Sequence, residues 1–119
     1  MQQTHVSSRY GTFEIAPPED LLEYIPEFLG NRENDLVALQ EALNKGNYVE
    51  LFRLGHRIKG VCQPFGFEIL GRIAKDLEAA AHREDRELCE TLVKEFEAVL
   101  KDVSRDFPAR EQKDTPALM

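Results

Sequence analysis

Residues 51–66 read LFRLGHRIKGVCQPFG, and this stretch carries the clearest helical pattern in the chain. Its apolar residues recur at three- and four-residue spacing, which is typical of a helix with one buried face. Successive residues of a helix are turned by about 100°, so His56 lies about 160° from both Leu54 and Ile58. The pattern therefore predicts a helix at about 48–63 that buries its apolar side and turns its histidine toward solvent.

The same periodicity occurs on both sides of this segment. Short turns separate the periodic stretches, and helices joined by short turns pack as antiparallel neighbours. Asn47 is expected to cap the helix that follows it. We expect helices at about 18–24, 26–44, 48–63, 67–83 and 86–105. The predicted fold class is all-α: an antiparallel up-down-up-down four-helix bundle with a short additional N-terminal helix.

The chain has 119 residues, which is long enough for one domain with a core and too short for two. Residues 1–16 show no sustained period, and we expect a flexible N-terminal segment there. The helical domain is expected to cover residues 17–106. The polar remainder, residues 107–119, is expected to be a disordered tail. No strand alternation competes with the helical pattern.

The charge of the chain limits its partners. Fifteen Lys and Arg residues against 22 Asp and Glu residues give a formal net charge of −7. Such a chain repels phosphate backbones, which argues against nucleic-acid binding. No apolar stretch approaches the roughly 20 residues that span a bilayer, and the N-terminus lacks the basic and apolar regions of a signal peptide. We therefore expect a cytoplasmic protein without membrane contact, and we expect it to be a monomer.

The cysteines and the other histidines do not indicate a disulfide, a metal site or a catalytic role. Cys62 and Cys89 are isolated on predicted helices, which indicates buried free thiols rather than a disulfide. Three scattered histidines and no Cys-x-x-Cys pair argue against a zinc site, so we expect no metal ligands. His5 and His82 are interpreted as ordinary surface histidines.

The face that carries His56 has a composition suited to phosphate chemistry. A neutral imidazole is a nitrogen nucleophile that can hold a phosphoryl group as a phosphoramidate. Lys59 can reach phosphate oxygens, and Arg53 and Arg57 add positive potential. The residues within about 60° of His56 around the helix are Phe52, Arg53, Lys59, Gly60 and Gln63. Together they predict that His56 accepts a phosphoryl group.

Each of these residues also has an ordinary structural interpretation. The three cations fit a solvated helix face, and Gly60 fits close packing against another helix. Gly60 costs a helix roughly 1 kcal/mol relative to alanine, which calls for some compensation. Our hypothesis is that it leaves clearance for the phosphoryl group, while the Gln63 amide donates a hydrogen bond to the ring or the phosphate.

The motif resembles that of the histidine-phosphotransfer (HPt) domains of multistep phosphorelays. Their signature is His-x-(Leu/Ile)-Lys-Gly, then four residues, then an apolar or aromatic residue and glycine. Here it stands as HRIKGVCQPFG at residues 56–66, preceded by the small residue Gly55. The leucine-rich helix with a terminal glutamate that usually follows is similar to residues 69–78. The resemblance covers about residues 20–104.

This resemblance implies that His56 is phosphorylated and that Lys59 stabilises the phosphoryl group. It also implies partners: response-regulator receiver domains and a hybrid or other histidine kinase. The receiver would supply the catalytic aspartates and the Mg²⁺, so this chain would bind no cofactor and have no kinase activity. Phe52, Arg53, Arg57, Gly60 and Gln63 would contact the partner. The sequence departs from the family after the Lys-Gly pair, where Pro64 predicts an early helix end beside Gln63.

Two other functions fit the same sequence. One is the phosphoacceptor domain of a chemotaxis-type histidine kinase, which is similar in the same motif and takes its phosphate from ATP through a separate catalytic domain. The other is an adaptor bundle that binds partner helices without being phosphorylated.

Overall fold

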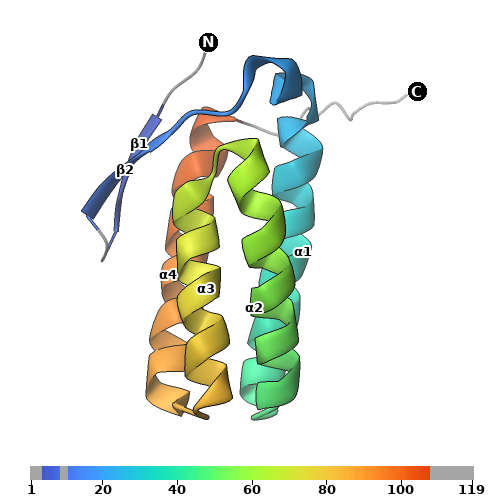
Figure 1. Cartoon of the computed structure of the whole chain (residues 1–119), viewed down its shortest axis with the longest axis vertical. Helices are drawn as coiled ribbons and strands as arrows, with labels where there is room; N and C mark the ends of the chain where they lie inside the picture. Colours follow the sequence, from blue (N-terminus) through green and yellow to red (C-terminus); the bar gives the residue numbers. More distant parts are fainter. Residues whose placement is uncertain (1–3, 9–10, 108–119) are drawn as a thin grey trace.

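The computed structural model describes residues 4–8 and 11–107. Four helices form the body of the molecule (Figure 1). They are α1 (Ile25–Asn44), α2 (Tyr48–Cys62), α3 (Glu68–His82) and α4 (Arg86–Asp106). Two short 3-10 helices, η1 (Glu19–Tyr24) and η2 (Gln63–Phe65), precede α1 and follow α2. Two strands, β1 (Thr4–Ser8) and β2 (Gly11–Ile15), come first in the chain.

The helix ends follow from local chemistry. The Asn47 side chain accepts a hydrogen bond from the backbone N–H of Glu50 at 3.1 Å, so the predicted cap is confirmed. Asp85 caps α4 in the same way through the N–H of Leu88, at 3.2 Å. At the other end of α2, Pro64 falls in the 3-10 turn, since its ring cannot continue an α-helix.

The helices lie side by side and are joined at alternating ends. In Figure 1 the turns from α1 to α2 and from α3 to α4 lie at the lower end, and the turn from α2 to α3 lies at the upper end. The prediction of a core of four helices is confirmed. No helix in the described part of the chain is both long and apolar enough to cross a membrane.

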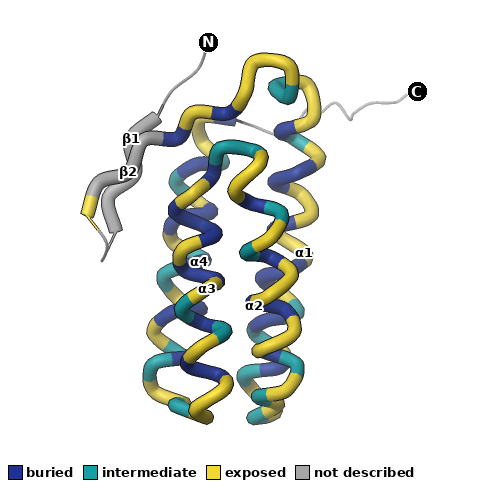
Figure 2. The backbone as a smooth tube through the Cα atoms, viewed as in Figure 1, coloured by how far each residue is buried: buried dark blue, intermediate teal, exposed yellow. Residues whose placement is uncertain are grey.

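The core lies along the inner faces of all four helices (Figure 2). Leu51, Leu54 and Ile58 are buried, as their spacing predicts. The two cysteines are buried free thiols, also as expected, and burial raises the pKa of Cys62 to about 12. We predicted the tail to begin at residue 107, but Phe107 is buried and its ring meets the Phe67 ring edge-on at 5.8 Å. Residues 108–119 lie outside the described residues.

The N-terminal region contains a hairpin that the sequence analysis did not predict. β1 and β2 pair antiparallel, with Thr4 opposite Ile15 and Ser8 opposite Gly11, where we expected a flexible segment at residues 1–16. β1 lies against α4 and β2 against α3. A two-stranded hairpin is marginal in water without such support, so these strands depend on contacts with the helices that the local sequence does not show. Residues 1–3 and 9–10 of the predicted segment lie outside the described residues. The predicted N-terminal helix corresponds to the 3-10 helix η1.

α2 and α3 form the most extensive helix pair in the bundle, and Gly55 lies at their contact. A Cβ atom on Gly55 would lie 2.9 Å from the carbonyl oxygen of Ala74 and 3.1 Å from the amide nitrogen of Glu78. Both are backbone atoms of α3, so neither can turn aside. Gly60, one turn and a half later on α2, is exposed and would place its Cβ in open space.

These two glycines predict opposite effects on stability. We expect Gly55→Ala to lower the free energy of unfolding by about 1–3 kcal/mol, because the added methyl forces α2 and α3 apart. Gly60→Ala meets no obstacle and is expected to raise it by about 1 kcal/mol through helix propensity. Urea unfolding of both variants measures the difference. A Gly55→Ala variant as stable as Gly60→Ala would contradict the close approach.

Candidate functional site

His56 stands on the outer side of α2, beside α3. Its side chain is 67% exposed, which agrees with the position that helical spacing assigned to it. Nδ1 of the ring lies 2.9 Å from Oε2 of Glu78, which α3 presents across the gap. The contact joins residues 22 positions apart in the chain, and the glycine at position 55 lets the two helices approach closely enough to make it.

Glu78 also binds the lysine of the motif. Lys59 Nζ donates a hydrogen bond to Oε1 of Glu78 at 3.0 Å, so the two carboxylate oxygens serve His56 and Lys59 separately. Partial burial acts to raise the pKa of Glu78, but the hydrogen bonds from Lys59 and His56 outweigh it and hold the pKa below its ordinary value. Glu78 is therefore an ionised carboxylate near neutral pH.

This arrangement selects one tautomer of the histidine. An ionised carboxylate carries no proton and only accepts, so Nδ1 must be the protonated nitrogen. The lone pair of the neutral ring is then on Nε2, the nitrogen not bound to Glu78. An exposed imidazole held in this way offers a nucleophilic nitrogen to a partner.

The predicted cations each have a carboxylate partner. Arg53 Nε donates to Oε1 of Glu50 at 2.9 Å, and this bond lowers the pKa of Glu50. A terminal nitrogen of Arg57 donates to Oδ1 of Asp35 on α1 at 2.8 Å. With the contact between Lys59 and Glu78, the predicted positive face is a set of ion pairs. The sequence does not predict these pairs, because two of the three acidic partners are on other helices.

Arg57 belongs to a contact between α1 and α2. Asp35 is buried and accepts hydrogen bonds from both Arg57 and Arg32, each at 2.8 Å. The Arg32 guanidinium also lies over the Phe28 ring, 4.7 Å from its centre. This network accounts for the burial of Arg32. Arg57 links two helices, a role that sequence spacing did not indicate.

The remaining predicted residues extend along α2. Gly60 is exposed, and the space that its side chain would occupy is open. Gln63 is exposed in η2, about 10 Å along the axis from His56. Phe52 is 39% exposed, and its ring centre lies 6.0 Å from that of His82. The structure thus brings together His56, Lys59 and Glu78. Glu78 is the site residue that we did not name, although the family pattern places a glutamate at the end of that helix.

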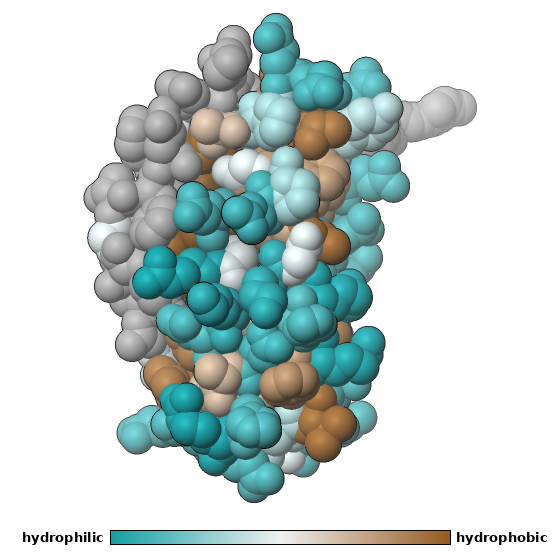
Figure 3. Space-filling model, viewed as in Figure 1, coloured by the Kyte–Doolittle hydropathy of each residue, from teal (hydrophilic) through white to brown (hydrophobic). Residues whose placement is uncertain are grey.

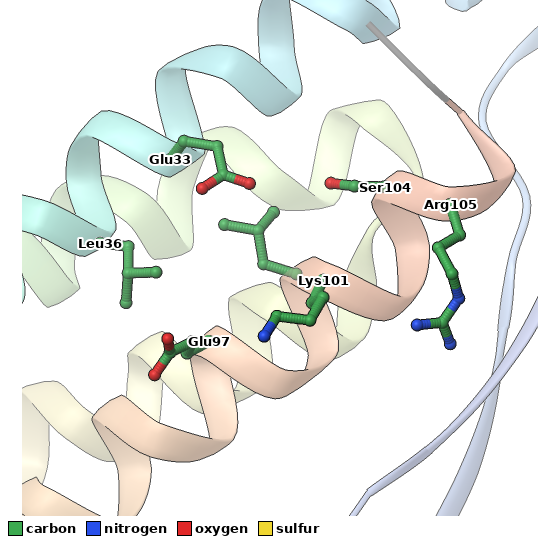
Figure 4. Close-up of a pocket in the computed structure, with 7 residues that line it drawn as sticks. Glu33, Leu36, Glu97, Lys101, Ser104 and Arg105 are labelled. Atoms are coloured by element: carbon green, nitrogen blue, oxygen red, sulfur yellow. The ribbon is translucent and has the colours of Figure 1, made fainter.

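A groove lies on the surface between α1 and α4 (Figure 4). Glu33 and Leu36 line it from α1, and the charged side chains of Glu97, Lys101 and Arg105 stand on α4. Its lining residues are Glu33, Leu36, Glu97, Leu100, Lys101, Ser104 and Arg105. None of them belongs to the predicted site. Over residues 4–8 and 11–107, no group of three or more His, Cys, Asp and Glu side chains is placed to hold a metal ion.

Comparisons with known proteins assign the family. The Hpt domain model matches residues 23–106, and the chain therefore belongs to the Hpt domain family. The fold is similar to the crystal structure of histidine-containing phosphotransfer protein B (HptB) from Pseudomonas aeruginosa PAO1, with a TM-score of 0.67 and 22% sequence identity. That match covers 83% of this chain and 96% of the other. No match was found among curated proteins. Hpt domains act in histidine phosphotransfer within phosphorelays, where they interact with receiver domains and histidine kinases.

The buried carboxylate of Asp35 predicts a large loss of stability when it is removed. Asp35→Ala leaves Arg32 and Arg57 without their partner, and we expect the free energy of unfolding to fall by about 3–5 kcal/mol. Asp102→Ala, which removes the exposed partner of Arg105, is the control and should cost under about 1 kcal/mol. Equal losses in urea unfolding would exclude a stabilising role for the network.

The tautomer of His56 can be observed directly. In the parent protein, ¹⁵N NMR is expected to show a protonated Nδ1 and an unprotonated Nε2. Glu78→Ala removes the acceptor, so the two ring nitrogens should shift toward a mixture of tautomers. Glu87→Gln, on α4, is the control and should leave the His56 signals in place. A parent spectrum with the proton on Nε2 would refute the assignment.

Proposed function

We propose that His56 accepts a phosphoryl group from the phosphoaspartate of one receiver domain and passes it to the aspartate of another. The observation that carries this proposal is the Glu78 carboxylate, shared between Nδ1 of His56 and the Lys59 ammonium. It leaves Nε2 as the nucleophile and keeps a cation beside it. Membership of the Hpt domain family supports the same conclusion.

The transfer step balances without an external base. The Nε2 lone pair attacks phosphorus, a P–N bond forms, and the P–O bond to the donor aspartate breaks to release its carboxylate. Nδ1 keeps its proton throughout, so the ring becomes a cation, which the Glu78 carboxylate stabilises. In the reverse direction the neutral imidazole is the leaving group, so the same contact serves acceptance and donation.

Lys59 is suited to stabilise the phosphoryl group. Its side chain is 37% exposed and its ammonium is already held beside His56 by Glu78. An ammonium has three donor hydrogens, so Lys59 can keep its bond to Glu78 and still donate to a phosphoryl oxygen. Gly60 supports the approach of the donor, since no side chain stands between His56 and the next turn.

The rest of the machinery belongs to the partner. We propose that the receiver domain brings its aspartate and its bound Mg²⁺ to His56, and that this chain acts as a cytoplasmic monomer without a cofactor of its own. Phe52 and Arg53, which flank His56, contact the receiver, and Gln63 lies at the far edge of the contact. Arg57 contributes by fixing α2 against α1 through Asp35.

Phosphate transfer to His56 is the direct test. After mixing with a phosphorylated receiver, the parent protein should carry phosphate that is labile to acid and stable to base, as a phosphohistidine is. His56→Gln should abolish labelling, and His5→Gln, at a histidine of β1, should retain it. Labelling of His56→Gln at the parent rate would falsify the proposal.

The same assay separates the other candidate functions. Labelling by a kinase and ATP with no receiver present would instead favour the phosphoacceptor domain of a chemotaxis-type kinase. An adaptor bundle would bind its partner with unchanged affinity after His56→Ala and would take no phosphate.

A further inference from the structure

The chain between β2 and η1 crosses the upper end of the bundle, beside the turn from α2 to α3 (Figure 1). Ile15 and Pro17 are buried there. Between them, the N–H of Ala16 donates a hydrogen bond to the carbonyl oxygen of Gly66 at 3.4 Å. We call residues 15–17 the strap. The family match begins at residue 23, so the strap lies outside it.

Gly66 is the point at which the strap meets the turn. Its φ is +83°, a left-handed value that favours glycine. A Cβ atom there would also lie 2.5 Å from the carbonyl oxygen of Ala16 and 2.7 Å from Cα of Pro17. The last glycine of the motif is therefore required twice, by its own conformation and by the backbone of the strap.

Pro64 makes the end of α2 dependent on support from outside the helix. Proline has no N–H, so it cannot donate to the carbonyl four residues earlier. The N–H of Phe67 instead donates to the carbonyl oxygen of Cys62 at 3.1 Å. The N–H of Gly66 donates to that of Gln63 at 3.0 Å. The turn that the strap holds thus closes the end of α2.

Aromatic side chains hold the inner side of this turn. Phe65 and Phe67 flank Gly66, and the ring centre of Phe28 on α1 lies 4.5 Å and 5.1 Å from theirs. Figure 3 shows hydrophobic atoms at the upper end of this face of the molecule and mainly hydrophilic atoms over its middle. The turn is therefore fixed by apolar packing on one side and by the strap on its backbone.

The last turn of α2 also carries part of the phosphotransfer site. Lys59 lies three residues before Cys62, and its ammonium reaches Glu78. α3 packs on this turn at Gly71, where a Cβ atom would lie 3.6 Å from the carbonyl oxygen of Lys59 and 3.5 Å from Cβ of Cys62. The position of Lys59 therefore depends on how the end of α2 and the turn after it are held.

We propose that the strap positions the phosphotransfer site: by holding the turn after α2, it keeps the last turn of that helix formed and Lys59 beside His56. This inference rests on the proposed function and adds to the site a segment that lies outside the family match. The strap acts through Lys59, so Ile15 and Pro17 are positioning residues. It also compensates for the hydrogen bond that Pro64 cannot make.

Amide hydrogen exchange tests the hold on the turn. Ile15→Ala removes the buried anchor of the strap, and we expect exchange at Gly66 and Phe67 to become about tenfold faster relative to the buried Leu92 of α4. Val99→Ala, at another buried residue of α4, is the control for a general loss of stability and should leave this ratio unchanged. Ile15→Val should give a smaller change in the same direction, and it keeps the test available if Ile15→Ala does not fold. An unchanged ratio in both variants would exclude the hold.

Labelling by two donors tests the effect on the site. Phosphoramidate is small and transfers its phosphoryl group to a histidine nitrogen with release of ammonia, so it reports on His56 and Lys59 without docking. We expect Ile15→Ala to slow labelling about threefold to fivefold with phosphoramidate and with a phosphorylated receiver alike, and Val99→Ala to slow neither.

Three results would overturn one of the two proposals. Unchanged labelling with both donors would show that the strap supports only the fold. A loss with the receiver alone would overturn the positioning role and indicate that the N-terminal region contacts the receiver. If the parent protein takes phosphate from phosphoramidate but from no receiver, the proposed function fails, while the exchange ratio and the phosphoramidate rate still decide the role of the strap.

Discussion

The contact between α2 and α3 at Gly55 is the constraint on which the site depends. With no side chain at this position, the backbone of α3 comes within van der Waals range of α2, and Glu78 then lies beside His56. A larger residue would separate the helices and lengthen both bonds to Glu78. The small residue before the histidine thus determines where Glu78 lies relative to His56.

The basic residues around that contact form ion pairs with carboxylates. Lys59, Arg57 and Arg53 each hold a carboxylate, so the face of an acidic protein is locally close to neutral. The pairing also holds Lys59 in place beside His56, so the proposed transfer would require little reorganisation of the lysine.

The two sides of His56 differ in character. Toward the start of α2 lie Phe52, Val49 and an apolar groove, and toward its end lie Gly60 and Gln63, with open space and polar groups. The first side offers area for binding and the second offers clearance.

Much of the helical structure follows from the spacing of apolar residues along the sequence. The period of Leu51, Leu54 and Ile58 was enough to predict the buried face of α2, and therefore the exposure of His56, because helix geometry relates spacing to direction. Asn47 marked a helix start in the same local way. The hairpin was not predicted because two isolated strands are marginal in water, and these depend on α3 and α4 for support. Asp35 and Glu78 escaped as site residues because each meets its partner across 22 positions of sequence, through the packing of separate helices. The sequence determines which side of its own helix a residue occupies. The packing of the helices determines which carboxylate lies beside that residue. Here the packing places Glu78 beside Nδ1 of His56 and so sets the tautomer of the ring.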